Sequence, residues 1–393
     1  MQAPPQIGAV LIAHPIAEMY GSDRVMLETI EAAAGRGWAV HVTVPGPGPL
    51  VEEIRHRGAT VSYDNTPVLR KTALRPRGLL RLITQAASGL FAGLRLIRSV
   101  RPAVIYVSTL TIPLWVVIGR LLRVPVLVHM HESERQAPRV LRRALAAPLL
   151  LAGRIVVNSD FSRSVLVDSL PTLGRRAQVL YNGVPGPARP SPARPSPART
   201  AIDGPAPAAV PRPAGPPQGS QVAVTVVHEL RDRGRDVRLD LVGAVFPGYE
   251  WFEQELRSQI AAAGLTGRVR LLGFQPDVWQ HLANADVLLV PSQVDVPFGN
   301  AAGEAVLAGR PVVVSRGSGL DEPVRGVSAA RRVDPVDAAA WADAVEDLLD
   351  YRPATRAQVA VDAVAAGRRF APSTYRELIA DHLDALAGAG MTG

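Results

Sequence analysis

The chain has 393 residues, of which 47% are hydrophobic, enough for the cores of roughly two or three domains. It contains no cysteine, which excludes disulfides and thiolate metal sites and fits a reducing compartment. The formal net charge of +8 is carried almost entirely by arginine, because Lys71 is the only lysine. An arginine-rich composition is also typical of a GC-rich genome, so the charge alone does not indicate a function.

Strands and helices alternate along residues 1–184. A buried strand is predicted at Gln6–His14, a glycine turn at Met19–Arg24 and a helix at Val25–Arg36. This alternation favours a parallel, doubly wound sheet, in which ligands bind at the carboxyl ends of the strands. Gly21 and Ser22 lie in the turn after the first strand, where a phosphate or an acceptor would approach.

The segment 67–101 is basic and apolar, and no acidic residue interrupts it. Its basic residues are Arg70, Lys71, Arg75, Arg77, Arg81, Arg95, Arg98 and Arg101. A pair of basic amphipathic helices can lie on an anionic membrane surface, so 70–101 is predicted to make that contact. The alternative is a solvated helix face over the sheet. Nucleic acid is not indicated as a partner, because aromatic residues are sparse and no nucleic-acid-binding motif appears.

The apolar run Val104–Val128 is broken by prolines and arginines, so it is predicted to form two buried strands and a helix rather than a membrane span. Met1–Pro5 lacks the basic and apolar regions of a signal peptide. We therefore expect a cytoplasmic location, with peripheral attachment to the inner face of the cell membrane as the alternative.

The densest polar cluster of the N-terminal half follows the strand at 124–129. It contains His129, His131, Glu132 and Glu134. Three interpretations are open. His129 and His131 share a face and could bind a metal, the segment could be a loop that caps the next helix, or it could form a ligand site of the family described below.

Pro185–Gln218 is rich in Pro, Ala and Arg and repeats Ala-Arg-Pro-Ser-Pro twice from Ala188. This composition predicts a flexible or polyproline-type linker without a core. Alternating strands and helices then resume from 219 and continue to 370. A last helix is expected within 371–393.

Pro291–Ser315 carries the most informative pattern. Asn300 is predicted to cap a helix that Gly309 ends, and a short buried strand follows. The free backbone N–H groups at Gly299, Asn300 and Ala301 would bind an anion.

This stretch resembles the signature of retaining family-4 glycosyltransferases (glycosyl transferases group 1), which have the two-Rossmann GT-B fold. The matching residues are Pro297, Phe298, Gly299, Glu304, Ala305, Gly309, Pro311, Val312 and Val313. The first glutamate of the pattern is absent, because Val296 stands in its place and Asp295 lies one residue away. The resemblance covers roughly 6–184 and 219–386.

The resemblance implies an α/β protein of two Rossmann-like, doubly wound domains facing across a cleft. They would be an N-terminal acceptor domain (1–184) and a nucleotide-sugar domain (219–370), with 371–393 as a cross-over helix. The donor would bind between the domains, and neither a cofactor nor a metal would be required. His131 and Glu132 would be the catalytic pair at the donor sugar. The implied donor-binding residues are Gly21, Ser22, Arg212, Phe274, Pro297, Phe298, Gly299, Asn300, Ala301 and Glu304.

One family feature is missing. Family members neutralise the donor diphosphate with an Arg and a Lys at the start of the second domain, where Pro213 and Gln218 stand here. Two explanations are open for 185–218. It is either an authentic linker, with Arg212 serving the phosphate, or a degenerate segment left by a reading-frame slip.

The predicted function is transfer of a sugar from a nucleotide-sugar to a glycan or lipid-linked acceptor, in cell-surface polysaccharide or glycolipid synthesis. The alternatives are a catalytically impaired GT-B protein that acts as a scaffold, and a phosphorylase or epimerase of the same fold.

Overall fold

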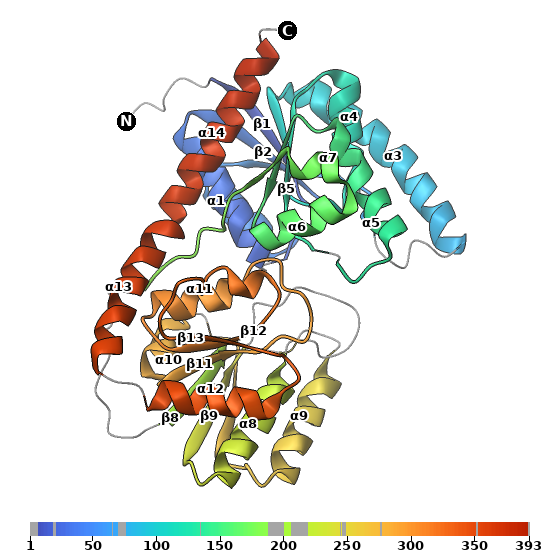
Figure 1. The fold of residues 1–393 in the computed structure, drawn as a ribbon. Coiled ribbons are helices and arrows are strands. Elements are labelled where there is room, and N and C mark those ends of the chain that lie inside the picture. The colour runs from blue at the N-terminus through green and yellow to red at the C-terminus, as the bar shows by residue number, and fades with distance from the viewer. Residues whose placement is uncertain are drawn as a thin grey trace. The chain divides into compact units, whose positions relative to one another are not determined.

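The computed structural model describes residues 7–18, 21–64, 66–69, 76–133, 135–187, 200–205, 219–243, 245, 249–275, 277–350 and 353–391. The chain forms two compact units (Figure 1), Met1–Gly183 with Pro372–Gly393, and Val184–Ala371. Each unit is an α/β domain on a parallel sheet, so the predicted fold class is confirmed.

The first unit has a seven-stranded parallel sheet in the order β3-β2-β1-β4-β5-β6-β7. Its strands are β1 (Gly8–Ala13), β2 (Trp38–Val44), β3 (Thr60–Tyr63), β4 (Val104–Val107), β5 (Val126–Met130), β6 (Arg154–Val157) and β7 (Ala177–Val179). The central strands β4 and β5 are apolar along most of their length, because helices cover both faces of the sheet. The strand order reverses between β1 and β4, which is where doubly wound sheets bind ligands.

The helices of the first unit pack in two layers. They are α1 (Gly21–Gly35), α2 (Pro49–His56), α3 (Pro76–Val100), α4 (Leu114–Leu122), α5 (Arg139–Ala146), η2 (Ala147–Leu151), α6 (Asp160–Ser169), α7 (Pro171–Gly174) and α14 (Pro372–Met391). Residues of α1, α2 and α14 share one apolar core, and those of α3, α4 and α6 share the core on the other face. The C-terminal helix α14 therefore completes the first unit.

Three predictions for this unit can be compared with the structure. The prediction of a glycine turn at 19–24 is wrong for residues 21–24, because α1 already begins at Gly21. The helix pair expected within 67–101 is a single helix, α3, while 70–75 lie outside the described residues. The run 104–128 forms two strands and a helix as predicted, and no helix in the described ranges is both long and apolar enough to cross a bilayer.

The second unit has a six-stranded parallel sheet in the order β10-β9-β8-β11-β12-β13. Its strands are β8 (Thr200–Pro205), β9 (Val237–Val242), β10 (Val269–Gly273), β11 (Val287–Val290), β12 (Val312–Ser315) and β13 (Ala330–Val333). Its helices are α8 (Ser220–Asp232), α9 (Glu250–Ala262), α10 (Trp279–Asn284), α11 (Asn300–Leu307), η3 (Gly319–Asp321), α12 (Ala338–Leu349) and α13 (Pro353–Arg369).

The position of β8 corrects the linker prediction for 185–218. This strand pairs with β9 on one side and β11 on the other, so it occupies the middle of the sheet. Its sequence, Thr-Ala-Ile-Asp-Gly-Pro, lacks the run of β-branched residues that marks the neighbouring strands. Pairing on both sides, rather than intrinsic preference, makes this segment a strand.

Candidate functional site

Polar side chains gather at the carboxyl ends of the first unit's central strands, where the strand order reverses. His14 follows β1 and is hydrogen-bonded through Nε2 to Asp23 Oδ1 at 2.8 Å and through Nδ1 to Ser108 Oγ at 2.6 Å. All three residues are buried. Asp23 lies in the first turn of α1, where the helix dipole favours a negative charge. The sequence analysis did not select His14 or Ser108, although His14 ends a predicted strand.

His131 lies at the end of β5, beside this cluster. Both of its ring nitrogens are buried and have no hydrogen-bond partner among the residues that the structure describes. Burial, assisted by the neighbouring His14 and opposed by Asp23, lowers the pKa of His131 to about 3. The imidazole is therefore neutral near pH 7 and offers one N–H donor and one acceptor nitrogen.

Glu132 has a different role from His131. Its Oε1 accepts a hydrogen bond from the Thr109 hydroxyl, and its Oε2 accepts from the backbone N–H groups of Leu110 at 3.4 Å and His131 at 3.2 Å. Burial raises the pKa of this carboxyl, and the bond from Thr109 opposes the rise. Glu132 thus connects the loops that follow β4 and β5 and holds the backbone of His131.

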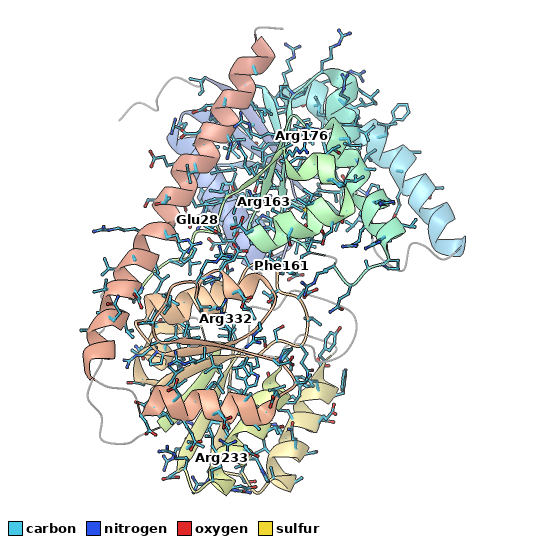
Figure 2. The ribbon with its side chains drawn as sticks, viewed as in Figure 1. Glu28, Phe161, Arg163, Arg176, Arg233 and Arg332 are labelled. Carbon is cyan, nitrogen blue, oxygen red and sulfur yellow. The ribbon has the colours of Figure 1, made fainter. Side chains whose placement is uncertain are left out.

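The helix that follows β6 begins with a side-chain cap. Ser159 accepts a hydrogen bond from the Ser162 N–H at 2.8 Å, and Arg163, labelled in Figure 2, pairs with Asp160 at 2.8 Å. The Ser159 hydroxyl therefore stabilises the start of α6.

In the second unit, the signature segment forms the loop after β11 and helix α11. Helix α11 begins at Asn300 with Gly299 at the N-cap position and no side-chain cap, so the prediction that Asn300 caps it is wrong by one residue. Gly309 has φ +65° just beyond the helix, which confirms the predicted stop. Gly219 precedes α8, which also lacks a side-chain cap. Helix N-termini without a side-chain cap favour anion binding, but the Asn300 N–H donates to Phe298 O at 3.2 Å, so the prediction that it is free is wrong.

Two glycines let the loops of this edge pack backbone against backbone. The Gly319 N–H donates to Val296 O at 2.8 Å, and a Cβ on Gly319 would lie 2.0 Å from Pro297 O. A Cβ on Gly299 would lie 2.7 Å from Leu320 Cδ2. The loop after β12 therefore sets the position of the α11 N-terminus. The sequence patterns did not predict this contact.

The two phenylalanines of the predicted donor site have different surroundings. Phe298 is buried and packs edge-on against Phe370, with ring centroids 5.8 Å apart, so it contributes to the core. Phe274 directly follows β10 and is 69% exposed, which leaves an aromatic face open at the carboxyl edge of the sheet. Only Phe274 presents a surface on which a base could stack.

The remaining predicted residues are placed as follows. Pro297 and Ala301 belong to the loop and first turn of α11, and Glu304 lies one turn further on. Gly21 and Ser22 are the first residues of α1. Arg212 lies outside the described residues. Within the described ranges, no group of three His, Asp or Glu side chains could hold a metal ion.

Two family models match the chain. The model of Glycosyltransferase Family 4 matches residues 19–185, and the model of Glycosyl transferases group 1 matches residues 209–351. The two matched segments fall largely in the first and second unit respectively.

Curated relatives match part of the chain. A D-inositol 3-phosphate glycosyltransferase of Corynebacterium diphtheriae is 35% identical over 157 residues, which is 39% of this chain and 36% of that protein. A 2-deoxystreptamine glucosyltransferase of Streptomyces kanamyceticus is 36% identical over 135 residues, 34% of this chain and 33% of that protein. The alignments thus span about a third of each relative's length.

Solved structures show the same fold. The Anabaena protein HepE in complex with UDP-glucose has a TM-score of 0.76 at 20% identity, over 96% of this chain and 99% of that one. A glycosyltransferase from Rickettsia africae has a TM-score of 0.78 at 15% identity, over 96% and 98%. With both units matched by family models and with the GT-B fold, the chain belongs to glycosyltransferase family 4.

Proposed function

We propose that the protein is a retaining glycosyltransferase that moves a sugar from a nucleotide-sugar donor to an acceptor hydroxyl. The observation that carries this proposal is the state of His131, a neutral imidazole whose two buried nitrogens lack partners among the described residues. Leaving buried polar atoms unpaired costs free energy that a bound ligand would recover. A neutral imidazole can donate to one sugar hydroxyl and accept from another.

The second unit supplies features that suit the nucleotide. The N-terminus of α11, which lacks a side-chain cap, would favour the donor diphosphate, Glu304 one turn further on would accept from ribose hydroxyls, and Phe274 would offer its exposed aromatic face to the base. UDP is the first nucleotide to test, because the similar HepE was solved with UDP-glucose.

Retention proceeds by attack on the same face of the sugar. The bond from the acceptor oxygen to the anomeric carbon forms as the bond to the leaving phosphate breaks, and the acceptor proton passes to that phosphate. This route needs no pair of carboxylates at glycosidase spacing. Neither a metal nor a cofactor is part of it. Family membership favours this enzyme over a scaffold that has lost turnover.

The acceptor is proposed to be a glycan or a lipid-linked sugar, used in cell-surface polysaccharide or glycolipid synthesis. The described part of α3 exposes Phe91 (81%) together with Arg95 and Arg98, a combination that suits an anionic membrane surface. The curated relatives are named for inositol phosphate and 2-deoxystreptamine, so both cyclitols belong in the acceptor panel.

The test is a calorimetric and thermal-shift titration of the purified protein with UDP, GDP and their sugars. Binding of one nucleotide, weakened by Glu304→Ala, supports a working donor site and identifies the base. The anomeric configuration of any product, read by NMR, tests retention. If no nucleotide binds, the donor site is refuted and the scaffold alternative is favoured.

A further inference from the structure

Two buried tyrosine hydroxyls lie at one nitrogen of His129, the residue two positions before His131, and a threonine hydroxyl lies behind them. Tyr106 OH lies 2.8 Å and Tyr375 OH 3.4 Å from His129 Nδ1. Thr29 Oγ1 lies 2.6 Å from Tyr375 OH, which connects the group to α1. All four residues are at most 2% exposed. In a dry interior such a network fixes the position of every member.

The network extends by ring contact to His131. The imidazoles of His129 and His131 lie 4.0 Å apart between centroids, tilted by 40°. Alternate residues of a strand face the same side, which brings the two rings together at the end of β5. No hydrogen bond among the described residues fixes the His131 ring. Its packing on His129 therefore contributes strongly to its orientation.

Tyr375 comes from the far end of the chain and is held tightly. It lies in the first turn of α14, next to Gly183, where an added Cβ would be 2.9 Å from Pro372 Cα and 3.3 Å from Tyr375 Cβ. Further bonds hold α14 along its length, from Arg36 to Asp381 and Asp384, from Trp38 to Asp384, from Arg376 to Glu28 and Glu31, and from Arg154 to His382.

We propose that Tyr375 is a positioning residue for His131 and acts through His129. The Tyr375 hydroxyl, itself bonded to Thr29, holds the His129 ring together with the nearer Tyr106 hydroxyl, and that ring supports the His131 imidazole at the sugar site. This inference rests on the proposed function of His131 as the group that orients the donor sugar. It makes the C-terminal helix part of the sugar site of the first unit.

The test compares Tyr375→Phe, which removes only the hydroxyl, with Tyr63→Phe, which removes a hydroxyl from a half-exposed tyrosine of the same unit. Imidazole ¹⁵N signals are recorded on the full chain, whose eight histidines keep the spectrum tractable, and His131→Gln assigns His131. We expect the His129 and His131 signals to move in Tyr375→Phe and to stay in the control. Loss of one hydrogen bond in the chain should lower the sugar-transfer rate about fivefold, and UDP affinity should not change because UDP lacks the donor hexose that His131 would contact.

Unchanged His131 signals in Tyr375→Phe would overturn the proposal, even if the His129 signals move. A transfer rate equal to that of the control would do the same. If Tyr375→Phe does not fold, Thr29→Val removes the other end of the 2.6 Å contact and gives the same comparison. If the wild-type protein transfers no sugar from any donor, the proposed function fails, while the NMR comparison still decides whether Tyr375 positions His131.

Discussion

Gly319→Ala should disturb the loop before α11 in the second unit more than the similar change Gly303→Ala nearby. The added Cβ would lie 2.0 Å from Pro297 O, 2.5 Å from Pro297 C and 2.7 Å from Val296 O. Since Cβ atoms essentially never approach closer than 3.0 Å, the two loops must separate by about 1 Å. Backbone on both sides of the contact leaves no flexible side chain to absorb that shift.

The expected losses of stability and of sugar transfer follow from this separation of the loops. Overpacking of this kind costs about 1–3 kcal/mol of unfolding free energy, and each kcal/mol lowers Tm by about 2–4 °C for a unit of this size. A shift of about 1 Å at the α11 N-terminus should also reduce sugar transfer by roughly 100-fold. Differential scanning calorimetry and initial rates with the donor identified by titration measure both effects.

Gly303→Ala, in α11 itself, is the matched control. Its added Cβ would meet Val184 Cγ2 at 3.5 Å, an ordinary contact, and alanine favours a helix over glycine by up to about 1 kcal/mol. This variant should keep or raise Tm and keep donor binding. If Gly319→Ala matches Gly303→Ala in both Tm and transfer rate, the packing of these two loops does not set the position of α11, and the reasoning is refuted.

Three further predictions test other parts of the molecule. Phe274→Ala should weaken UDP binding by about 5- to 150-fold, from the loss of about 1–3 kcal/mol of stacking, with little change in Tm because the ring is exposed. The control Phe91→Ala, which removes another exposed phenylalanine, should leave the UDP affinity measured by calorimetry unchanged. Equal UDP affinities for the two variants would exclude stacking on Phe274. Because the pKa of folded His131 is about 3, the unfolded chain takes up a proton below pH 6.5 that the folded chain does not. Stability should therefore fall as pH drops from 6.5 toward 3, and His131→Gln should flatten that fall in urea titrations at pH 7, 6 and 5; parallel curves would contradict the buried neutral state. Arg235 and Arg233 lower the pKa of Glu346 below 4.5, so this carboxylate stabilises the folded state above pH 4.5 and loses that effect as pH falls through its lowered pKa. Glu346→Gln should lower Tm at pH 7 and converge with wild type in acid, and an equal Tm at pH 7 would show that the network contributes nothing.

Periodicity and apolar runs predicted most strands and helices of both sheets, because a parallel strand covered on both faces must be apolar along its length. The same rule explains the failure at β8. Its residues Ala201, Asp203, Gly204 and Pro205 are poor strand formers, and the segment lies within Pro- and Arg-rich sequence. Only the pairing with β9 and β11 makes it a strand, and no local pattern reports that pairing.

The candidate site was likewise predicted only in part from the sequence. The signature motif identified the loop and helix around Gly299, but it grouped core and surface residues together, since Phe298 packs in the interior while Phe274 faces outward. A motif records which residue types recur at a spacing, whereas burial depends on what packs against each side chain. Only the structure distinguishes a residue that shapes the loop from one that can touch a ligand.

The residues that hold His131 in position show most clearly what could not be predicted from the sequence. Tyr375 and His129 are 246 positions apart, and Tyr375 and Thr29 are 346 apart, so no spacing rule connects them. Each residue alone suits an ordinary helix or strand position. They meet because α14 returns to the first unit and Gly183 lets its first turn approach closely. A site assembled by such long-range packing depends on the first turn of α14, so removing this helix should impair His131 although no residue of the signature is lost.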